Sequence, residues 1–197
     1  MRFASLGSGS RGYALVVVAG CTCIMLDCGF GFAAAASRLP RIGLAAEDVD
    51  AIVVTHEHDD HIGGVARFAA RLGIPVYLTP GTWAAVARRF ARVECRYFDP
   101  HAPFQIGDIE VDPFPVPHDA REPAQVIFDD GKQRLGILTD VGVATPHIRS
   151  MLSGCSARKL RRIVGFRQVG SHHVPQARVV QAREQCGGVF VAHVAEA

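Results

Sequence analysis

A histidine-rich segment between a predicted strand and a predicted helix is the feature that most constrains this chain. Residues 55–61 read THEHDDH and hold three histidines and three acidic side chains. The apolar run Ala51–Val54 before it predicts a buried central strand, and the periodic apolar residues of Ile62–Leu72 after it predict a helix. So many polar groups are costly to bury beside a hydrophobic strand. Because ligands bind at the carboxyl ends of strands in α/β folds, a functional site is favoured over a solvated loop.

The spacing within this segment indicates a metal site. In extended backbone His56 and His58 point to the same side, so both imidazoles can bind one metal ion. Asp60 and His61 come where the chain turns into the helix, which directs them toward a second position nearby. Imidazoles with few carboxylates favour Zn²⁺, and a more oxygen-rich site would take Mn²⁺ or Fe. Two ions ~3.5–4 Å apart would suit a hydrolytic reaction.

Two more candidate ligands follow predicted strands elsewhere in the chain. His118 lies in the sequence PVPHD of residues 115–119, where the prolines restrict the loop. Asp140 follows the apolar stretch 136–139, and a carboxylate at a strand end can bridge two metal ions. The competing interpretations are a surface histidine for His118 and a turn or helix cap for Asp140.

The order of the expected elements predicts an α/β layered sandwich, in which mixed sheets are covered by helices. A chain of 197 residues favours one domain. Strands are expected at Phe3–Leu6, Tyr13–Val18, Thr22–Leu26, Ala51–Val54, Pro75–Leu78, Phe104–Val116, Gln125–Phe128 and Leu135–Leu138. Helices are expected at Phe32–Leu39, Ile62–Leu72, Thr82–Phe90 and Pro146–Leu152.

Composition and the first residues favour a soluble cytoplasmic protein. Hydrophobic residues make up 49% of the chain and charged residues 20%, which is ordinary for a globular domain. No apolar run approaches the ~20 residues that span a bilayer, and the first residues lack the apolar core of a signal peptide. The six cysteines include no CxxC pair, so reduced thiols are expected rather than a redox site.

These motifs together resemble the metallo-β-lactamase superfamily, which has the HxHxDH signature after a hydrophobic strand. The resemblance covers residues 1 to about 155. It includes the opening SLGSGS of residues 5–10, LDCG of 26–29, the HxHxDH motif of 56–61, PHD of 117–119 and LTD of 138–140. It implies a four-layer αβ/βα sandwich with a dinuclear metal site.

The resemblance also implies a role for each matching residue. His56, His58 and His118 would hold the first metal ion, Asp60 and His61 the second, and Asp140 would bridge them. Asp27 would orient the metal ligands without binding the metal itself. Two divalent ions, Zn²⁺ above all, would activate a water that attacks phosphorus or a carbonyl carbon. Asp60 would orient this water or take its proton, and is the expected catalytic residue.

Two branches of the superfamily fit these motifs. The opening segment and the short LTD strand end are similar to the phosphodiesterase and nuclease-like branch, so a phosphodiester in a nucleic acid or a cyclic nucleotide-like molecule is the expected substrate. Thioester hydrolases of the glyoxalase II type share the metal motif and stay as an alternative. The turn at residues 7–12 could offer backbone N–H groups to a phosphate, or it could be a tight hairpin or bulge.

Residues 156–197 depart from this pattern. From residue 157 the chain holds seven Lys and Arg against two Asp and Glu, although its total net charge is only +2. The superfamily expects one more metal-binding histidine here, and His172, His173 and His193 lie in unconvincing contexts for it. We interpret 1–155 as the domain and 156–197 as a divergent basic segment, either native or out of frame or truncated, which would leave the sandwich incomplete. This departure keeps two alternatives open: a catalytically impaired metal-binding relative, and a nucleic-acid-binding module that uses the basic segment.

Overall fold

The fold is built from two mixed β-sheets and short helices. A computed structural model describes residues 1–8, 12–160, 178–179 and 191–193. The strands are β1 Arg2–Gly7, β2 Ala14–Ala19, β3 Thr22–Leu26, β4 Ala51–Val53, β5 Val76–Leu78, β6 Cys95–Tyr97, β7 Phe104–Ile106, β8 Ile109–Pro115, β9 Ala124–Asp129, β10 Arg134–Leu138, β11 Ala157–Leu160, β12 Arg178–Val179 and β13 Val191–His193. The α-helices are α1 Phe32–Ala36, α2 Asp59–Ile62, α3 Val65–Leu72, α4 Pro80–Val86 and α5 Pro146–Leu152. Single turns of 3₁₀ helix are η1 Leu39–Ile42, η2 Ala46–Asp48 and η3 Ala87–Phe90.

The order of the strands places the ends of several parallel strands at one edge. The first sheet has the order β13-β1-β2-β3-β4-β5-β6 and the second the order β12-β11-β10-β9-β8-β7. In the first sheet β3, β4, β5 and β6 run parallel to one another. The loops that follow these strands therefore leave from the same edge, which is where α/β folds bind ligands.

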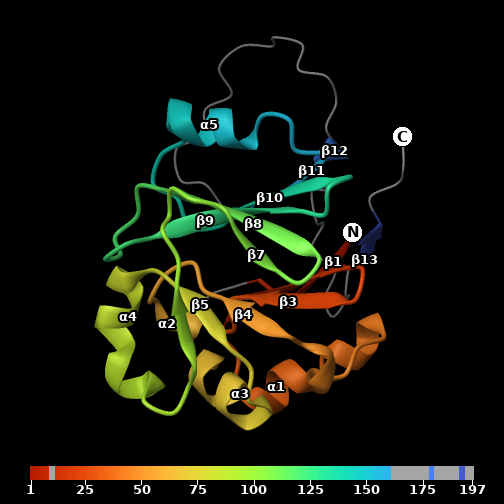
Figure 1. The fold of residues 1–197 in the computed structure, drawn as a ribbon, viewed down its shortest axis with the longest axis vertical. Helices are drawn as coiled ribbons and strands as arrows, with labels where there is room; N and C mark the ends of the chain where they lie inside the picture. The colour runs from red at the N-terminus through yellow and green to blue at the C-terminus, as the bar shows by residue number, and fades with distance from the viewer. Residues whose placement is uncertain (9–11, 161–177, 180–190, 194–197) are drawn as a thin grey trace.

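Three apolar clusters define four layers, as Figure 1 shows. The central cluster lies between the two sheets and includes Leu26 and Val53 from the first and Phe128 and Ile137 from the second. A second cluster joins the outer face of the first sheet to α1–α3. The third joins the second sheet to α5. The α/β four-layer αβ/βα sandwich predicted from the sequence is confirmed.

Most expected elements are present, but some are interrupted or shortened, and the helix expected over Thr82–Phe90 is α4 followed by the 3₁₀ turn η3. The helix expected over Ile62–Leu72 is divided into α2 and α3 by Gly63 and Gly64. A Cβ on Gly64 would lie 1.7 Å from the carbonyl oxygen of Phe30, so only glycine lets this helix pack so closely against the chain. The strand expected over Phe104–Val116 is two strands, because the turn at Gly107 divides it. The helix expected over Phe32–Leu39 ends at Ala36.

Four strands were not expected from the sequence. One of them, β11, lies in the basic C-terminal segment, and it pairs in parallel with β10. Its position near one edge of the sheet explains why charged side chains fit. Ala157 is buried between the sheets, whereas Arg158 donates from Nε to the carbonyl of Leu152 at 2.9 Å. The other three are β6, β12 and β13. Most of segment 156–197 lies outside the described residues, so its interpretation as a separate segment stays a prediction.

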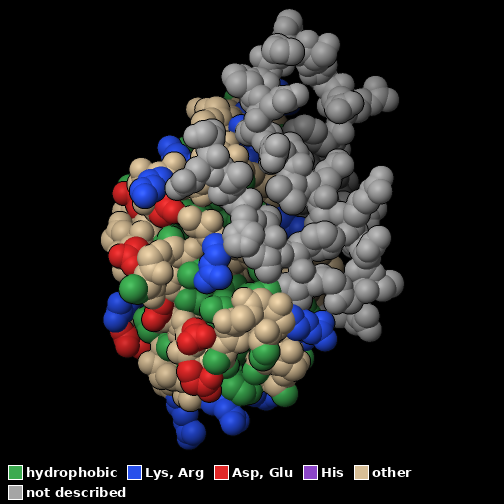
Figure 2. Space-filling view, turned by 90° about the vertical axis from the view of Figure 1, so that its right-hand side faces the viewer, with side chains coloured by type: hydrophobic (Ala, Val, Ile, Leu, Met, Phe, Trp, Pro, Cys, Tyr) green, Lys and Arg blue, Asp and Glu red, His purple; other side chains and the backbone are tan. Residues whose placement is uncertain are grey.

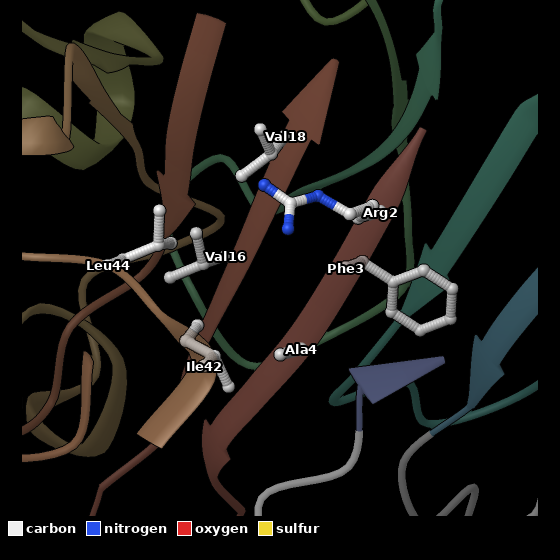
Figure 3. Close-up of a pocket in the computed structure, with 7 residues that line it drawn as sticks. All are labelled: Arg2, Phe3, Ala4, Val16, Val18, Ile42 and Leu44. Atoms are coloured by element: carbon white, nitrogen blue, oxygen red, sulfur yellow. The ribbon is translucent and has the colours of Figure 1, made fainter. Parts of the chain in front are cut away.

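The surface offers two further observations. On the face shown in Figure 2, acidic and basic side chains of the described residues lie close to one another. A shallow pocket on the first sheet is lined mainly by apolar side chains of β1, β2 and the segment around η1, with Arg2 beside Val18 (Figure 3). None of the candidate metal ligands lines it. Among the described residues, no helix has the length and apolarity that crossing a membrane requires.

Candidate metal centre

The HxHxDH segment lies where β4 ends and α2 begins. The backbone of Thr55 connects the segment to both sheets. Its N–H donates to the side chain of Asp27, which follows β3 of the first sheet, and its carbonyl accepts from the N–H of Ala124 in β9 of the second sheet at 3.0 Å. His58 is extended, with φ −65° and ψ 141°, and is the residue before α2. This backbone lets His56 and His58 face the same space, while the helix turn presents Asp60 and His61.

The first group of candidate ligands consists of His56, His58 and His118. His118 Nε2 lies 3.3 Å from His56 Nε2 and 3.2 Å from His58 Nδ1. Two nitrogens bound to one tetrahedral Zn²⁺ at 2.0–2.1 Å would be about 3.3–3.4 Å apart. The three rings therefore converge at the spacing that one shared ion requires, and these residues fit a metal.

The second group consists of His56, His61 and Asp140. His61 Nε2 lies 2.6 Å from Asp140 Oδ2 and 3.7 Å from Asp60 Oδ2. Asp60 and Asp140 side chains are 28% and 27% exposed, so both can reach a ligand in the open part of the site. Histidine and carboxylate donors together suit a divalent cation. The structure thus brings together the residues predicted to bind metal, with Asp60 beside the second group.

Asp27 supports His61 from the opposite side of its ring. Its Oδ2 lies 2.7 Å from His61 Nδ1 and accepts from the Thr55 hydroxyl at 2.8 Å, while its Oδ1 accepts from Thr55 N–H at 2.8 Å. Asp27 is fully buried and has φ 56°, a left-handed conformation that Asp and Asn adopt more readily than most residues. Binding Nδ1 in this way leaves Nε2 directed at the second group.

The two buried histidines differ in charge. Burial, together with the neighbouring histidines, lowers the pKa of His56 to about 2, so its imidazole is neutral. Burial also lowers the pKa of His61, but the carboxylates of Asp27 and Asp140 outweigh it and raise the pKa to about 9. The second group therefore favours a positive charge at His61 Nε2, which a proton or a divalent cation can supply.

The loop that carries His118 is fixed to its surroundings at several points. Glu57 Oε1 accepts from Arg121 N–H at 2.7 Å, and His58 Nε2 lies 3.1 Å from the carbonyl of Asp119. The Asp119 carboxylate, although 87% exposed, lies 3.0 Å from His118 Nδ1. Burial lowers the pKa of His118, and the Asp119 charge opposes that shift. With Nδ1 bound to Asp119, Nε2 is left to face the other two histidines.

Asp140 is positioned by a buried hydrogen-bonded pair, the side-chain amide of Gln125 and the preceding residue Thr139. Gln125 Nε2 donates to the Thr139 hydroxyl at 2.9 Å, and Thr139 N–H donates to Gln125 Oε1 at 2.9 Å. Both side chains are buried, so this pair joins the ends of β9 and β10 beneath Asp140. The sequence offered no signal for Gln125 or Glu57.

Tyr13 and Thr55 are further supporting residues that sequence reasoning missed. The Tyr13 ring stacks on His61, with centroids 5.2 Å apart. The Thr55 hydroxyl lies 2.9 Å from His56 Nδ1. This contact orients the His56 ring so that Nε2 faces the candidate metal site. A hydroxyl directly before the motif was the available signal for Thr55.

Of the three candidate histidines in the C-terminal segment, the structure describes only the backbone of His193. His172 and His173 lie outside the described residues, as do residues 9–11 of the glycine–serine turn. The backbone of β13 pairs His193 with Arg2, and Arg2 pairs on its other side with Val18. The strand end at Leu26, nearest the site, pairs instead with Leu15, so His193 lies toward the other end of the sheet.

Fold and site together define a sandwich protein with a His/Asp centre suited to divalent metal at the edge where parallel strands end. A family profile described as a β-lactamase superfamily domain matches residues 22–189. The chain therefore belongs to the metallo-β-lactamase superfamily, as the sequence motifs indicated.

Curated relatives share more than the motif. The chain is 32% identical over 163 residues to exodeoxyribonuclease YycJ of Bacillus anthracis, covering 80% of this chain and 61% of that protein. It is 30% identical over 156 residues to exodeoxyribonuclease WalJ of Streptococcus pneumoniae, covering 77% of this chain and 58% of that protein. The chain thus spans about three fifths of the length of these relatives.

Solved structures show the same fold at lower identity. The metallo-β-lactamase fold protein YhfI of Bacillus subtilis superposes with a TM-score of 0.68 at 18% identity, covering 80% of this chain and 68% of that one. Zn²⁺-bound PqqB of Methylobacterium extorquens gives 0.67 at 18% identity, covering 82% and 72%. A diphosphatase of the PhnP family gives 0.65 at 22% identity, covering 80% and 72%.

Proposed function

We propose that this chain is a metal-dependent phosphodiesterase that acts on DNA and uses two divalent metal ions. The histidine-rich set of ligands favours Zn²⁺ as the metal. The observation that carries the proposal is the position of His118 Nε2, which lies 3.3 Å from His56 Nε2 and 3.2 Å from His58 Nδ1. Three imidazoles at that spacing suit Zn²⁺. The names of the two exodeoxyribonuclease relatives support DNA as the substrate class.

The described residues divide into binding and supporting roles. His56, His58 and His118 would hold one ion, and His61, Asp60 and Asp140 the other, with Asp140 shared between them. Bound there, the ions would lower the pKa of a water molecule and neutralise charge on the phosphodiester. Asp60 would hold that water for attack and accept its proton, since its carboxylate is partly exposed beside His61.

The substrate can be tested with two kinds of phosphodiester and one thioester. Purified full chain with Zn²⁺ or Mn²⁺ is assayed against bis-p-nitrophenyl phosphate, against 5′-labelled single-stranded and double-stranded DNA, and against S-lactoylglutathione. We expect hydrolysis of both phosphodiesters and none of the thioester. Cleavage of the thioester alone would replace the proposal with the glyoxalase II alternative.

Metal content distinguishes an enzyme from an impaired relative. Protein purified without chelator is analysed by plasma mass spectrometry, and about two ions per chain are expected for a dinuclear site. One ion or none, together with no turnover of either phosphodiester, would favour the impaired metal-binding relative. Histidine ligands outside the described residues would be sought next by His172→Ala and His173→Ala.

A further inference from the structure

Two aromatic side chains form an exposed pair on the surface beside the site. Trp83 of α4 is 37% exposed and Tyr97 of β6 is 54% exposed. Their ring centroids lie 5.7 Å apart with the planes at 73°, so the two rings brace each other edge to face. A large aromatic ring that is exposed to water and held in one orientation can stack against another flat ring.

The pair lies along the strand edge that carries the metal centre. The HxHxDH segment follows β4, Trp83 lies in the helix that follows β5, and Tyr97 is the last residue of β6. These strands are parallel neighbours, so their ends share one edge. At about 4.8 Å per strand, Tyr97 lies about 10 Å along that edge from the end of β4.

The helix that carries Trp83 also touches the loop that carries His118. Gly81 N–H donates to Glu122 Oε2 at 2.6 Å, and the Thr79 hydroxyl donates to the carbonyl of Glu122 at 2.9 Å. Trp83 N–H donates in turn to the carbonyl of Thr79 at 2.9 Å. Direct hydrogen bonds therefore link the aromatic pair to the metal-binding loop. Figure 1 shows α4 and α2 on the same side of the molecule.

The chain between Trp83 and Tyr97 is rich in arginine. Four exposed arginines lie in or beside η3 and β6: Arg88, Arg89, Arg92 and Arg96. Two are paired, Arg89 with Asp59 at 2.9 Å and Arg96 with Glu94 at 2.6 Å. Arg88 and Arg92 form no salt bridge with any described residue. Exposed aromatic rings interleaved with cations are the combination that binds single-stranded nucleic acid.

We propose that Trp83 and Tyr97 form a base-stacking subsite for a single DNA strand whose phosphate lies at the metal centre. This inference rests on the proposed function and names how the substrate is held. The rings stack on bases, and Arg88 and Arg92 contact phosphates of the same strand. The subsite would favour single strands over duplex, because a paired base offers no free face to stack.

The single tryptophan gives a direct test, because Trp83 is the one Trp in the chain. Its fluorescence in the metal-loaded protein is titrated with oligo-dT whose phosphorothioate linkages resist hydrolysis, so that binding is measured without turnover. An abasic oligomer of equal length and charge serves as the matched ligand. We expect quenching by oligo-dT, little quenching by the abasic oligomer, and binding of oligo-dT weakened roughly fivefold to a hundredfold by Tyr97→Ala.

Variants separate stacking from charge and from folding defects. Tyr97→Phe keeps the ring and should bind like the wild type, whereas Arg92→Ala should weaken binding of both oligomers. Lys132→Ala, which removes an exposed cation in the β9–β10 turn, should weaken neither. Equal quenching by both oligomers, or unchanged binding in a folded Tyr97→Ala protein, would overturn the subsite. Hydrolysis of bis-p-nitrophenyl phosphate by the wild type tests the proposed function separately, since that small substrate is assayed without a DNA strand.

Discussion

Asp27 Oδ2 lies 2.7 Å from Nδ1 of His61, and both side chains are fully buried. The carboxylate therefore sets which nitrogen of His61 faces the metal centre and helps to raise the pKa of His61 to about 9 against the effect of burial. A metal ion at Nε2 would take the place of the proton that this environment favours. Asp27 is thus expected to act on metal affinity without touching the metal.

Asp27→Asn should weaken metal binding at the second group. Asparagine also tolerates the φ of 56°, so the backbone can stay as it is, but the negative charge of the Asp27 carboxylate beside His61 is lost. Mutation of a residue that supports a metal ligand in this way typically costs 10–100-fold in metal affinity. The measurement is Zn²⁺ binding by competition with a chromophoric chelator. Asp50→Asn is the matched control, because Asp50 bonds the other end of β3 through Cys23 N–H; equal losses in both variants would contradict the assigned role.

Asp60→Ala should abolish hydrolysis of bis-p-nitrophenyl phosphate and leave the fold intact. The side chain is partly exposed, so its removal disturbs little packing, whereas loss of a group that orients or deprotonates water costs about 10²–10⁴ in kcat. Asp59→Ala is the control from the same motif. Asp59 is 85% exposed and pairs only at the surface with Arg89, an interaction worth about 0–1 kcal/mol. Turnover that is unchanged in Asp60→Ala would refute the proposed role of Asp60.

The sequence could predict that the candidate ligands lie together, because their positions follow from where strands end and helices begin. His56, His58 and His61 are close in the chain, and a strand followed by a helix is enough to converge them. His118 and Asp140 were found because each follows an apolar strand, and strand ends meet at one edge. Asp27 was found by resemblance, and the structure adds why it lies there: Thr55 and His61 both bond to it.

Contacts between distant loops were not predictable from the sequence. Glu57 bonds Arg121 N–H in a loop of the other sheet, and Gln125 bonds Thr139 across the neighbouring strands β9 and β10, so both contacts depend on the tertiary arrangement. Neither has a local pattern that sets it apart from a surface residue. The break at Gly63 and Gly64 was missed for the same reason, since helical periodicity continues across it while the close approach to Phe30 is a tertiary constraint. Charged β11 was missed because its place near a sheet edge is a tertiary property as well.

Gly29→Ala should destabilise the protein and the site together. A Cβ at Gly29 would lie 1.9 Å from the carbonyl oxygen of Asp60, which also accepts the Tyr13 N–H at 2.7 Å. Forcing these segments apart should cost about 1–3 kcal/mol or more in the free energy of unfolding. The measurement is the midpoint of urea unfolding, compared between proteins whose denaturant slope m is unchanged. Gly31→Ala is the control, since no atom lies within 4 Å of its Cβ, and it should cost less than about 1 kcal/mol. Equal midpoints for the two variants would contradict the close packing of Gly29 on the HxHxDH segment.

Removal of metal should lower thermal stability as well as activity, because an ion that binds only the folded chain stabilises it by mass action. At a free concentration of about 100 times Kd the stabilisation is about 2.7 kcal/mol. We therefore expect chelator to lower Tm and added Zn²⁺ to restore it, as measured by differential scanning calorimetry. His118→Ala should reduce this Zn²⁺-dependent shift, because it removes the imidazole that faces both His56 and His58. His101→Ala, which removes an exposed histidine outside both groups, should keep the full shift. A shift of the same size in both variants would mean that Zn²⁺ stabilises the chain from some other place than the site assigned to it.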